Sequence, residues 1–188
     1  AVFDERLDRF TMAAIARRLG VVTPAIYRLF PSREEIVVAC LDRIAGGIRL
    51  PENETDWGAV LRLWADECWR GGEGFPGVSR VVYDYAPAFT RIEGIIAEYA
   101  RALAVHGKTA GQAMFALDFI GDTVFACHLG VESLREVDGR GVSGFDRVKD
   151  AVASSSIIEP RESWRERGVV DAKIEFILVG LEHHWPEI

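Results

Sequence analysis

The sequence lacks the segments that would take a protein to or through a membrane. It has no run of about 18 uncharged apolar residues, the length that a membrane-spanning helix needs, although hydrophobic residues make up 49% of the chain. The first ten residues, AVFDERLDRF, carry acids where a signal peptide has a basic region and an apolar core. We therefore expect a cytoplasmic protein with no membrane partner.

Cysteine is also scarce, and the few cysteines give no sign of pairing. Cys40, Cys68 and Cys127 are odd in number and widely spaced, and each lies inside an apolar helical pattern. Such a distribution is typical of buried thiols in a reducing compartment. The sequence therefore predicts no disulfide framework.

The motifs of common enzymes and metal sites are missing as well. The chain contains no glycine-rich phosphate loop, no Gly-x-Ser-x-Gly, no His-Glu-x-x-His and no Cys-x-x-Cys. Cys127-His128 and His183-His184 are adjacent pairs, and adjacent side chains on a helix point about 100° apart, which does not suit a shared metal ion. We expect neither an enzyme, nor a metal site, nor a bound cofactor.

An overall positive charge is lacking too, but the charge is unevenly distributed. A net charge of −7 argues against nucleic-acid binding, which relies on cations that displace counterions from phosphates. Residues 1–49, however, contain eight arginines and six acids, so the remainder carries a net charge of −9. Such asymmetry is a hint of a nucleic-acid module attached to something else.

Helical periodicity dominates the chain, and no convincing period-two alternation is present, so the predicted fold class is all-α. A polar linker at 51–56 divides the chain into a head (1–48) and a body (55–188). The head should contain three short helices. In the body we expect helices over 57–69 (ended by the glycines at 71, 72 and 74), 76–85, 87–106, 109–136, 145–153 and 169–185, with a mobile stretch at Ser154–Ser156.

Capping residues mark the helices of the head. Thr11 can cap a helix that Gly20 ends, and Thr23 supplies a second cap with proline directly after it, at the first helical position. Ser32 caps the third helix, with Glu35 three residues on as its capping-box partner.

Two short helices joined by a tight turn at Gly20 can place the second helix in a DNA major groove. The segment Phe10–Ile36 resembles the tetracycline-repressor (TetR) family in its Gly20-Val21, Ile26-Tyr-Arg-Leu-Phe30 and Arg33-Glu-Glu35. The resemblance is strong over about residues 3–48. It implies an N-terminal three-helix helix-turn-helix head and a C-terminal helical bundle for ligand binding and dimerisation, with a first helix that is truncated here.

The resemblance also implies which side chains touch DNA, and their chemistry agrees. Hydroxyls and free N–H groups at helix N-termini favour phosphates, arginine offers a bidentate cation, and small apolar groups can contact a thymine methyl. The expected phosphate contacts are Thr11, Tyr27 and Arg33, and the residues expected to face base edges or the groove wall are Val22, Thr23, Pro24, Ala25 and Arg28.

Two positions depart from the family pattern. Leu29 stands where family members often have a histidine, so one phosphate contact is expected to be missing. Ala13 stands where some members place a base-reading arginine. The operator sequence therefore cannot be copied from a relative.

The body is rich in aromatic side chains, which favours an apolar ligand pocket between its helices. Asp118 and Asp122 lie among these aromatics, and three explanations stay open: the acids are solvated, they pair across a dimer, or they orient a polar or cationic ligand. The expected lining residues are Trp64, Tyr83, Tyr99, Phe115, Asp118, Phe119, Asp122 and Phe125.

These inferences predict a ligand-responsive transcriptional regulator, with a repressor as the leading interpretation. It should bind a pseudo-palindromic double-stranded DNA operator as a homodimer, with two heads about 34 Å apart. The helices near 109–136 and 169–185 should form the dimer interface, and an unknown small-molecule effector should release the DNA. The alternative is a helical ligand-binding or scaffolding dimer whose head has lost DNA binding.

Overall fold

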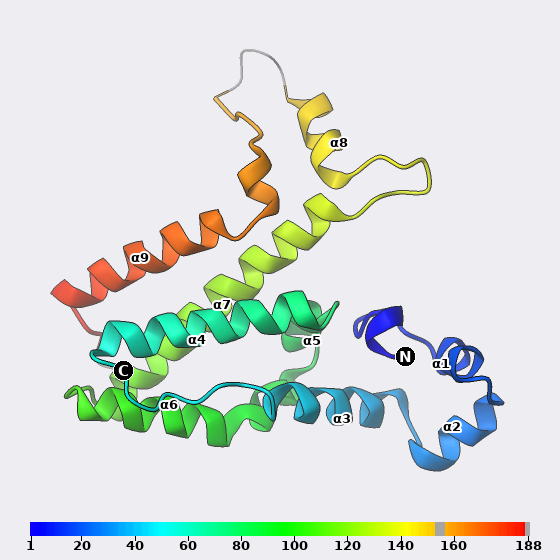
Figure 1. Ribbon diagram of the computed structural model, residues 1–188, viewed down its shortest axis with the longest axis horizontal. Helices are drawn as coiled ribbons and strands as arrows, with labels where there is room; N and C mark the ends of the chain where they lie inside the picture. Colours follow the sequence, from blue (N-terminus) through cyan, green and yellow to red (C-terminus); the bar gives the residue numbers. More distant parts are fainter. Residues whose placement is uncertain (153–156, 187–188) are drawn as a thin grey trace.

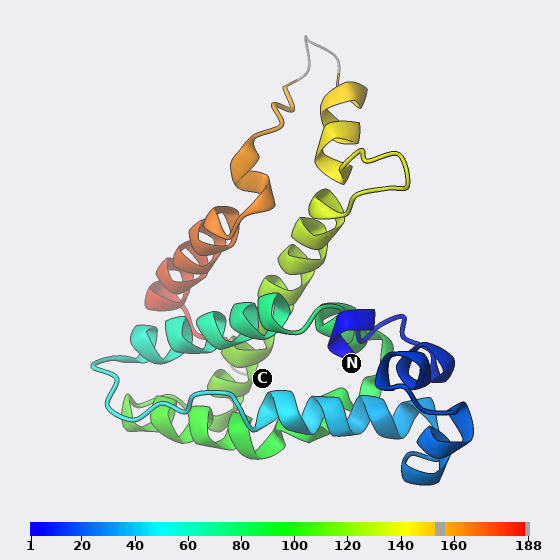
Figure 2. The ribbon, with the colours of Figure 1, turned by 45° about the vertical axis from the view of Figure 1, so that its right-hand side comes forward.

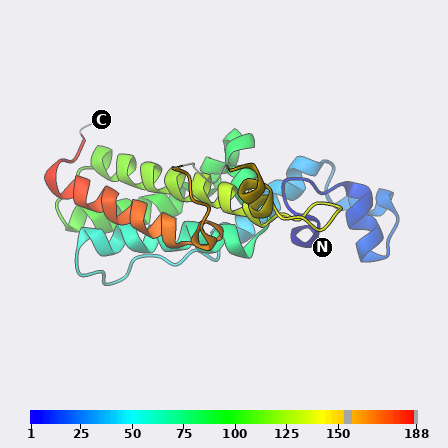
Figure 3. The ribbon, with the colours of Figure 1, turned by 90° about the horizontal axis from the view of Figure 1, so that it is seen from above.

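The computed structural model describes residues 1–152 and 157–186, and the regular elements within these ranges are all helical. The all-α prediction is confirmed, and the nearest approach to a strand is an isolated bridge between Val137 and Ser143. The molecule is elongated, with the first two α-helices at one end and the end of the last helix at the other (Figures 1 and 3). The predicted mobile stretch, Ser154–Ser156, lies outside the described residues.

The helices follow the chain in a simple order, with short 3-10 segments (η) between them. Their bounds are η1 (Phe3–Glu5), α1 (Met12–Leu19), α2 (Thr23–Leu29), α3 (Arg33–Ala45), α4 (Trp57–Gly74), α5 (Val78–Asp84), η2 (Ala86–Ile92), α6 (Glu93–Val105), α7 (Ala110–Arg135), α8 (Gly144–Ala151), η3 (Glu162–Arg165) and α9 (Gly168–His183).

The capping predictions for the head are confirmed at α1 and corrected at α2. The Thr11 hydroxyl accepts a hydrogen bond from the Ala14 N–H (3.1 Å), and Gly20 ends α1 in the left-handed conformation, at φ 66°. Thr23 does not cap α2, because it is itself the first helical residue and the capping position falls on Val22. The following proline has no N–H, and the Ala25 N–H bonds the carbonyl of Val22, so few donors remain for a side-chain cap.

The third helix begins as predicted, with half of the expected capping box. The Ser32 hydroxyl accepts a hydrogen bond from the Glu35 N–H at 3.2 Å. No hydrogen bond from the Ser32 N–H back to the Glu35 side chain is present among the described residues, so the reciprocal half of the box is not formed. A complete box is found instead at the start of α7, between Thr109 and Gln112.

The prediction that glycines end the first body helix after Trp69 is wrong. Helix α4 continues through three glycines to Gly74. A Cβ atom on Gly72 would lie 2.7 Å from the ring of His128, so the glycine allows α4 to approach α7 closely. The predicted helix over 87–106 is also corrected, because it forms as η2 and α6, which meet at Ile92.

Helix α7 is the centre of the body, and α4, α6 and α9 pack around it (Figure 1). Its buried side chains, such as Leu117, Ile120 and Val124, form the main apolar core together with Trp64 and Tyr99. By length and composition α7 could cross a membrane, but 39% of its most apolar window is buried in the protein. One such core helix does not indicate a membrane protein.

The head has its own apolar cluster, and this cluster continues into the body. Phe10, Ile15 and Ile26 lie in it, and so do Val78 and Val81 of α5. The backbone N–H of Leu7 also donates to the Pro76 carbonyl at 2.8 Å. The predicted domain boundary near residues 48–55 stays a prediction, and the apolar packing crosses it.

Candidate DNA-binding interface and effector cavity

The start of α1 and the outer side of α2 form a surface at the free end of the head (Figure 2). The buried side chain of Ile26 fixes α2 to the rest of the head, while Val22 (68% exposed) and Tyr27 (49% exposed) point away from it. Of the eight residues predicted to contact DNA, the exposed ones are Thr11, Val22, Pro24, Tyr27, Arg28 and Arg33, and the half-buried ones are Thr23 and Ala25.

The arginines of the head differ in whether the protein already neutralises them. Arg18 pairs with Asp4 (3.4 Å) and Glu5 (2.9 Å). Arg28, and Arg17 on α1, make no ion pair or hydrogen bond with other described residues. The guanidinium of Arg28 is therefore available to a partner outside the chain.

Arg33 is placed differently from what the sequence suggested. Its guanidinium donates to the backbone carbonyls of Asp8 (2.8 Å), Leu7 (3.2 Å) and Phe10 (3.3 Å), and lies 4.6 Å above the centre of the Phe10 ring. These contacts tie the start of α3 to the segment before α1. The side chain remains exposed, so its phosphate contact stays a prediction beside these contacts within the head.

Residues 3–40 match the family model for bacterial regulatory proteins of the tetR family. The chain carries the DNA-binding domain of a tetR-family regulator. No curated protein and no solved structure matches the chain. The helices α1 and α2, with their exposed outer side, lie inside the matched segment.

The segment before α1 is docked on the body through Glu132. The Glu132 carboxylate lies 3.2 Å from the Arg6 guanidinium and accepts a long hydrogen bond from the Gly77 N–H (3.5 Å). Arg6 also pairs with Asp8 (3.2 Å), and these carboxylates raise its pKa although partial burial opposes them. Gly77 has φ +89°, and a Cβ atom there would lie 2.2 Å from the Asp8 carboxylate, so only glycine fits this contact.

His128 lies one turn before Glu132 and is almost fully buried, at 2% exposure. Its Nδ1 atom is 2.9 Å from the Ser79 hydroxyl, and its Nε2 atom is 3.3 Å from the Glu73 carboxylate without good hydrogen-bond geometry. Burial lowers the pKa of His128, while the nearby Glu132 and Glu73 oppose this shift only in part. No sequence pattern predicts these contacts of Glu132 and His128, because each joins residues at least 49 positions apart.

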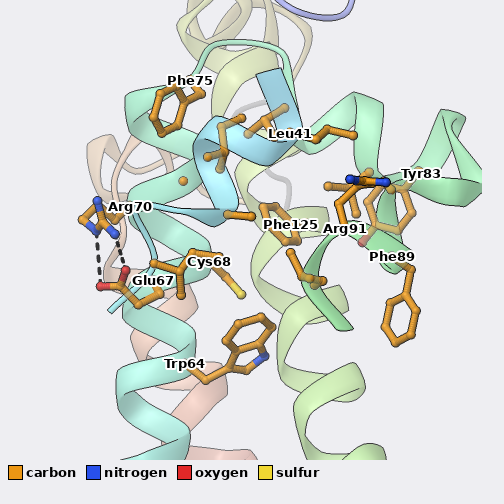
Figure 4. Close-up of a pocket in the computed structure, with 18 of the residues that line it drawn as sticks. Leu41, Trp64, Glu67, Cys68, Arg70, Phe75, Tyr83, Phe89, Arg91 and Phe125 are labelled. Carbon is orange, nitrogen blue, oxygen red and sulfur yellow. Dashed lines mark hydrogen bonds and ion pairs between the residues drawn. The ribbon is translucent and has the colours of Figure 1, made fainter. Parts of the chain in front are cut away.

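A second feature between head and body is a cavity of about 200 Å³ (Figure 4). Helices α3, α4, α5 and α7 and the segment η2 all contribute to its walls. The lining residues include Leu41, Ile44 and Ala45 from α3, Trp64, Glu67, Cys68 and Arg70 from α4, Val78, Val82 and Tyr83 from α5, Ala88, Phe89, Arg91 and Ile92 from η2, and Asp122 and Phe125 from α7.

The cavity brings together half of the residues predicted to line a ligand pocket, namely Trp64, Tyr83, Asp122 and Phe125. The other four lie elsewhere. Tyr99 is fully buried and its hydroxyl donates to the Arg49 carbonyl (2.7 Å), while the ring of Phe115 packs at a tilt against Phe119 with ring centres 5.6 Å apart. Asp118 is exposed, and Phe119 lines a groove on another face.

The contribution of α3 to the cavity was missed by sequence reasoning. On the apolar face of α3, Leu41, Ile44 and Ala45 form one wall of the cavity, although the sequence assigns this helix to the head. The available signal was the breadth of that face, which exceeds what packing within a three-helix head requires. A molecule in this cavity would therefore touch the helix that carries the head.

Helices α7 and α9 leave an apolar groove exposed on the surface of the body. Phe176 is 80% exposed, and Phe119, Val169 and Val179 are also exposed. Lys173 crosses the groove and its ammonium lies 3.2 Å from the Cys127 sulfur. Exposed large apolar side chains in one continuous patch are typical of an interaction surface.

Proposed function

We propose that this tetR-family regulator is a ligand-responsive repressor. It binds a pseudo-palindromic operator as a homodimer, and an effector in the cavity between head and body releases it. The observation that carries this proposal is that α3, the helix that continues the head, also forms a wall of an otherwise body-lined cavity. An occupant would act on the head directly, with no need for a long chain of intermediate contacts.

In the proposed complex, α2 lies in the major groove. Val22, Thr23, Pro24, Ala25 and Arg28 face base edges or the groove wall, and Thr11, Tyr27 and Arg33 lie against phosphates. One short recognition helix buries little surface, so specificity requires two heads about 34 Å apart. The unpaired guanidinium of Arg28 supports a role in reading guanine.

The proposed dimer forms through α7 and α9, whose exposed groove would close into a four-helix bundle across a two-fold axis. Phe176 would lie at its centre. In sedimentation velocity, wild-type protein at micromolar concentration should run as a dimer, and Phe176→Arg as a monomer. As a control, Phe89→Arg replaces another exposed phenylalanine outside the groove and should leave the dimer intact. A dimeric Phe176→Arg variant would contradict this interface.

The coupling between cavity and DNA can be tested without knowing the effector. Ala45→Phe places a ring in the cavity from the α3 side and mimics an occupant. A coupling of about 1–3 kcal/mol predicts an operator affinity weaker by about 5- to 150-fold, measured on a duplex that the wild-type protein selects from a random library. Ala104→Phe, at an exposed site on α6, is the matched control. Unchanged affinity in a folded, dimeric Ala45→Phe variant would overturn the release mechanism.

One observation favours a second candidate, a scaffolding dimer whose head no longer binds DNA. Arg6, Arg9 and Arg18 are all paired with carboxylates, so fewer cations remain for phosphates than the sequence contains. Salt dependence separates the two candidates. A functional head loses DNA affinity steeply as salt rises, whereas the scaffolding dimer shows no salt-sensitive DNA binding at all.

A further inference from the structure

The cavity between head and body has a wall chemistry that restricts its occupant. Most of the lining is apolar, and Trp64, Phe75, Phe89 and Phe125 add aromatic faces. At about 200 Å³ the cavity is smaller than the ~300–1,000 Å³ of pockets for drug-sized ligands, so it suits one ring with a short chain. Its charged groups decide which end group such a molecule can carry.

The two guanidinium groups at the cavity are already neutralised. Arg70 donates to Glu67 and to the Gly47 carbonyl, and the Glu67 carboxylate also accepts hydrogen bonds from the backbone N–H (2.9 Å) and guanidinium (2.6 Å) of Arg49. Burial acts to raise the pKa of Glu67, but these hydrogen bonds outweigh it and hold the pKa below its usual range. The carboxylate therefore stays ionised and balanced within the protein.

Arg91 is likewise paired, with the carboxylate of Asp42 on α3 at 2.7 Å. The cavity thus offers no free cation from either arginine to an incoming carboxylate or phosphate. An anionic ligand would have to break an existing ion pair in order to bind there. An acidic effector is therefore disfavoured by the charge arrangement.

Asp122 is different, because no cation balances it among the described residues. Its side chain is exposed at the edge of the cavity wall, and partial desolvation together with the neighbouring Asp118 raises its pKa. The Tyr83 hydroxyl donates to the backbone carbonyl of Asp122 (3.0 Å), and both residues line the cavity, so an aromatic side chain is held at the same part of the wall. Carboxylates and aromatic faces together attract a ligand cation.

We propose that the cavity binds a small apolar molecule with a single basic nitrogen, whose ring lies among the aromatic walls and whose ammonium group lies at Asp122. This inference rests on the proposed function, since it deepens the effector site to a ligand class. Of the three roles that the sequence left open for Asp122, the proposal selects the orientation of a cationic ligand.

A matched series of probes tests the ligand class. 4-Phenylbutylamine, 4-phenylbutanol and 4-phenylbutyrate share one apolar skeleton and differ only in the charge of the end group. The probes are compared by calorimetric titration of the full chain at pH 7 and low salt. The amine should bind about three- to fivefold more tightly than the alcohol, and about tenfold or more tightly than the carboxylate. Equal binding of the three, or preference for the carboxylate, would overturn the proposal.

Substitutions in and near the cavity then test whether the preference for the amine comes from Asp122. Asp122→Asn should remove the preference for the amine and leave the alcohol affinity unchanged, whereas Asp118→Asn, one turn earlier and outside the cavity, should keep the amine preferred. An equal loss of preference in both variants would indicate general surface potential and refute the site. Ala45→Phe should abolish binding of all three probes, and persistent binding would place them elsewhere.

The titrations contain no DNA, so the two proposals can fail separately. Selective amine binding without any effect on operator affinity would contradict the release mechanism alone. An operator affinity that responds to Ala45→Phe, with no selectivity among the probes, would contradict the ligand class alone.

Discussion

The two faces of the head use the same residue type in opposite ways. On the face toward the body, Arg6 and Arg9 are paired with carboxylates of the α7 end, and the backbone of Leu7 is bonded to Pro76. On the free face, the Arg28 side chain makes no ion pair or hydrogen bond within the described part of the chain, and the side chain of Val22 is 68% exposed. Side chains on the first face serve the fold, and those on the second are left for a partner outside the chain.

The largest effect, a loss of stability, is expected when the tightest contact on the body-side face of the head is disrupted. Gly77→Ala adds a Cβ atom 2.2 Å from the Asp8 carboxylate, at a positive φ that disfavours alanine. We expect the free energy of unfolding to fall by about 2–4 kcal/mol in urea titration.

The control is Gly94→Ala on α6, where a Cβ atom meets nothing within 4 Å. Because alanine favours a helix more than glycine, this variant should gain about 0.5–1 kcal/mol. A Gly77→Ala protein as stable as the wild type would mean that the head is not held at this contact.

The second-largest effect is expected on the free face of the head and concerns operator binding. Arg28→Ala should weaken operator binding by about 1–3 kcal/mol and leave the free energy of unfolding within about 0.5 kcal/mol of wild type, because the side chain has no partner among the residues that the structure describes. Arg18→Ala is the matched control, since that arginine is exposed but already paired. Fluorescence anisotropy with a selected duplex measures both, and equal losses would erase the distinction between the faces.

A smaller effect is expected from the ion pair that joins head and body. Glu132→Gln and Arg6→Met should each cost about 1 kcal/mol of stability, since both side chains are largely buried and hydrogen-bonded. The double variant should cost less than the sum of the two, and this coupling energy is the quantity to measure. Strict additivity would show that the pair contributes nothing.

The smallest effect is a pH dependence at the same junction. Because burial lowers the pKa of His128 below its reference of 6.5, the unfolded chain binds the proton more readily than the folded protein. The stabilising contribution is complete above about pH 6.5 and declines as the pH falls, with a slope of at most about 1.4 kcal/mol per pH unit. Urea titrations at pH 7.5, 6.5 and 5.5 should show this decline in the wild type and a weaker one in His128→Gln.

Local chemistry made much of the fold predictable from the sequence. Thr11 and Ser32 cap their helices and Gly20 ends α1 because the needed contacts lie within four residues. The predictions failed where a distant partner decides the outcome. The continuation of α4 through Gly72 depends on His128, more than fifty residues away, and no helix propensity contains that information.

The candidate site shows the same division. The surface of α2 follows from a continuous motif, and its exposure agrees with a role in contacting DNA. The cavity was half predicted, because aromatic content points to a body pocket but cannot show that Leu41 and Ile44 of the head helix complete it. Arg33 could not be placed, since its carbonyl partners near Leu7 depend on how the chain folds back.

The apolar cluster shared by α1, α2, α3 and α5 limits how this protein could be recombined with others. A head excised at the 51–56 linker would leave behind Val78, Val81 and Ala88, and would expose the faces of its own helices that they cover. Transplanting the head onto a foreign sensor would therefore require grafting α5 and η2 with it. In evolutionary terms, new operators are most easily reached by changes on the outer side of α2, while exchange of whole domains is discouraged.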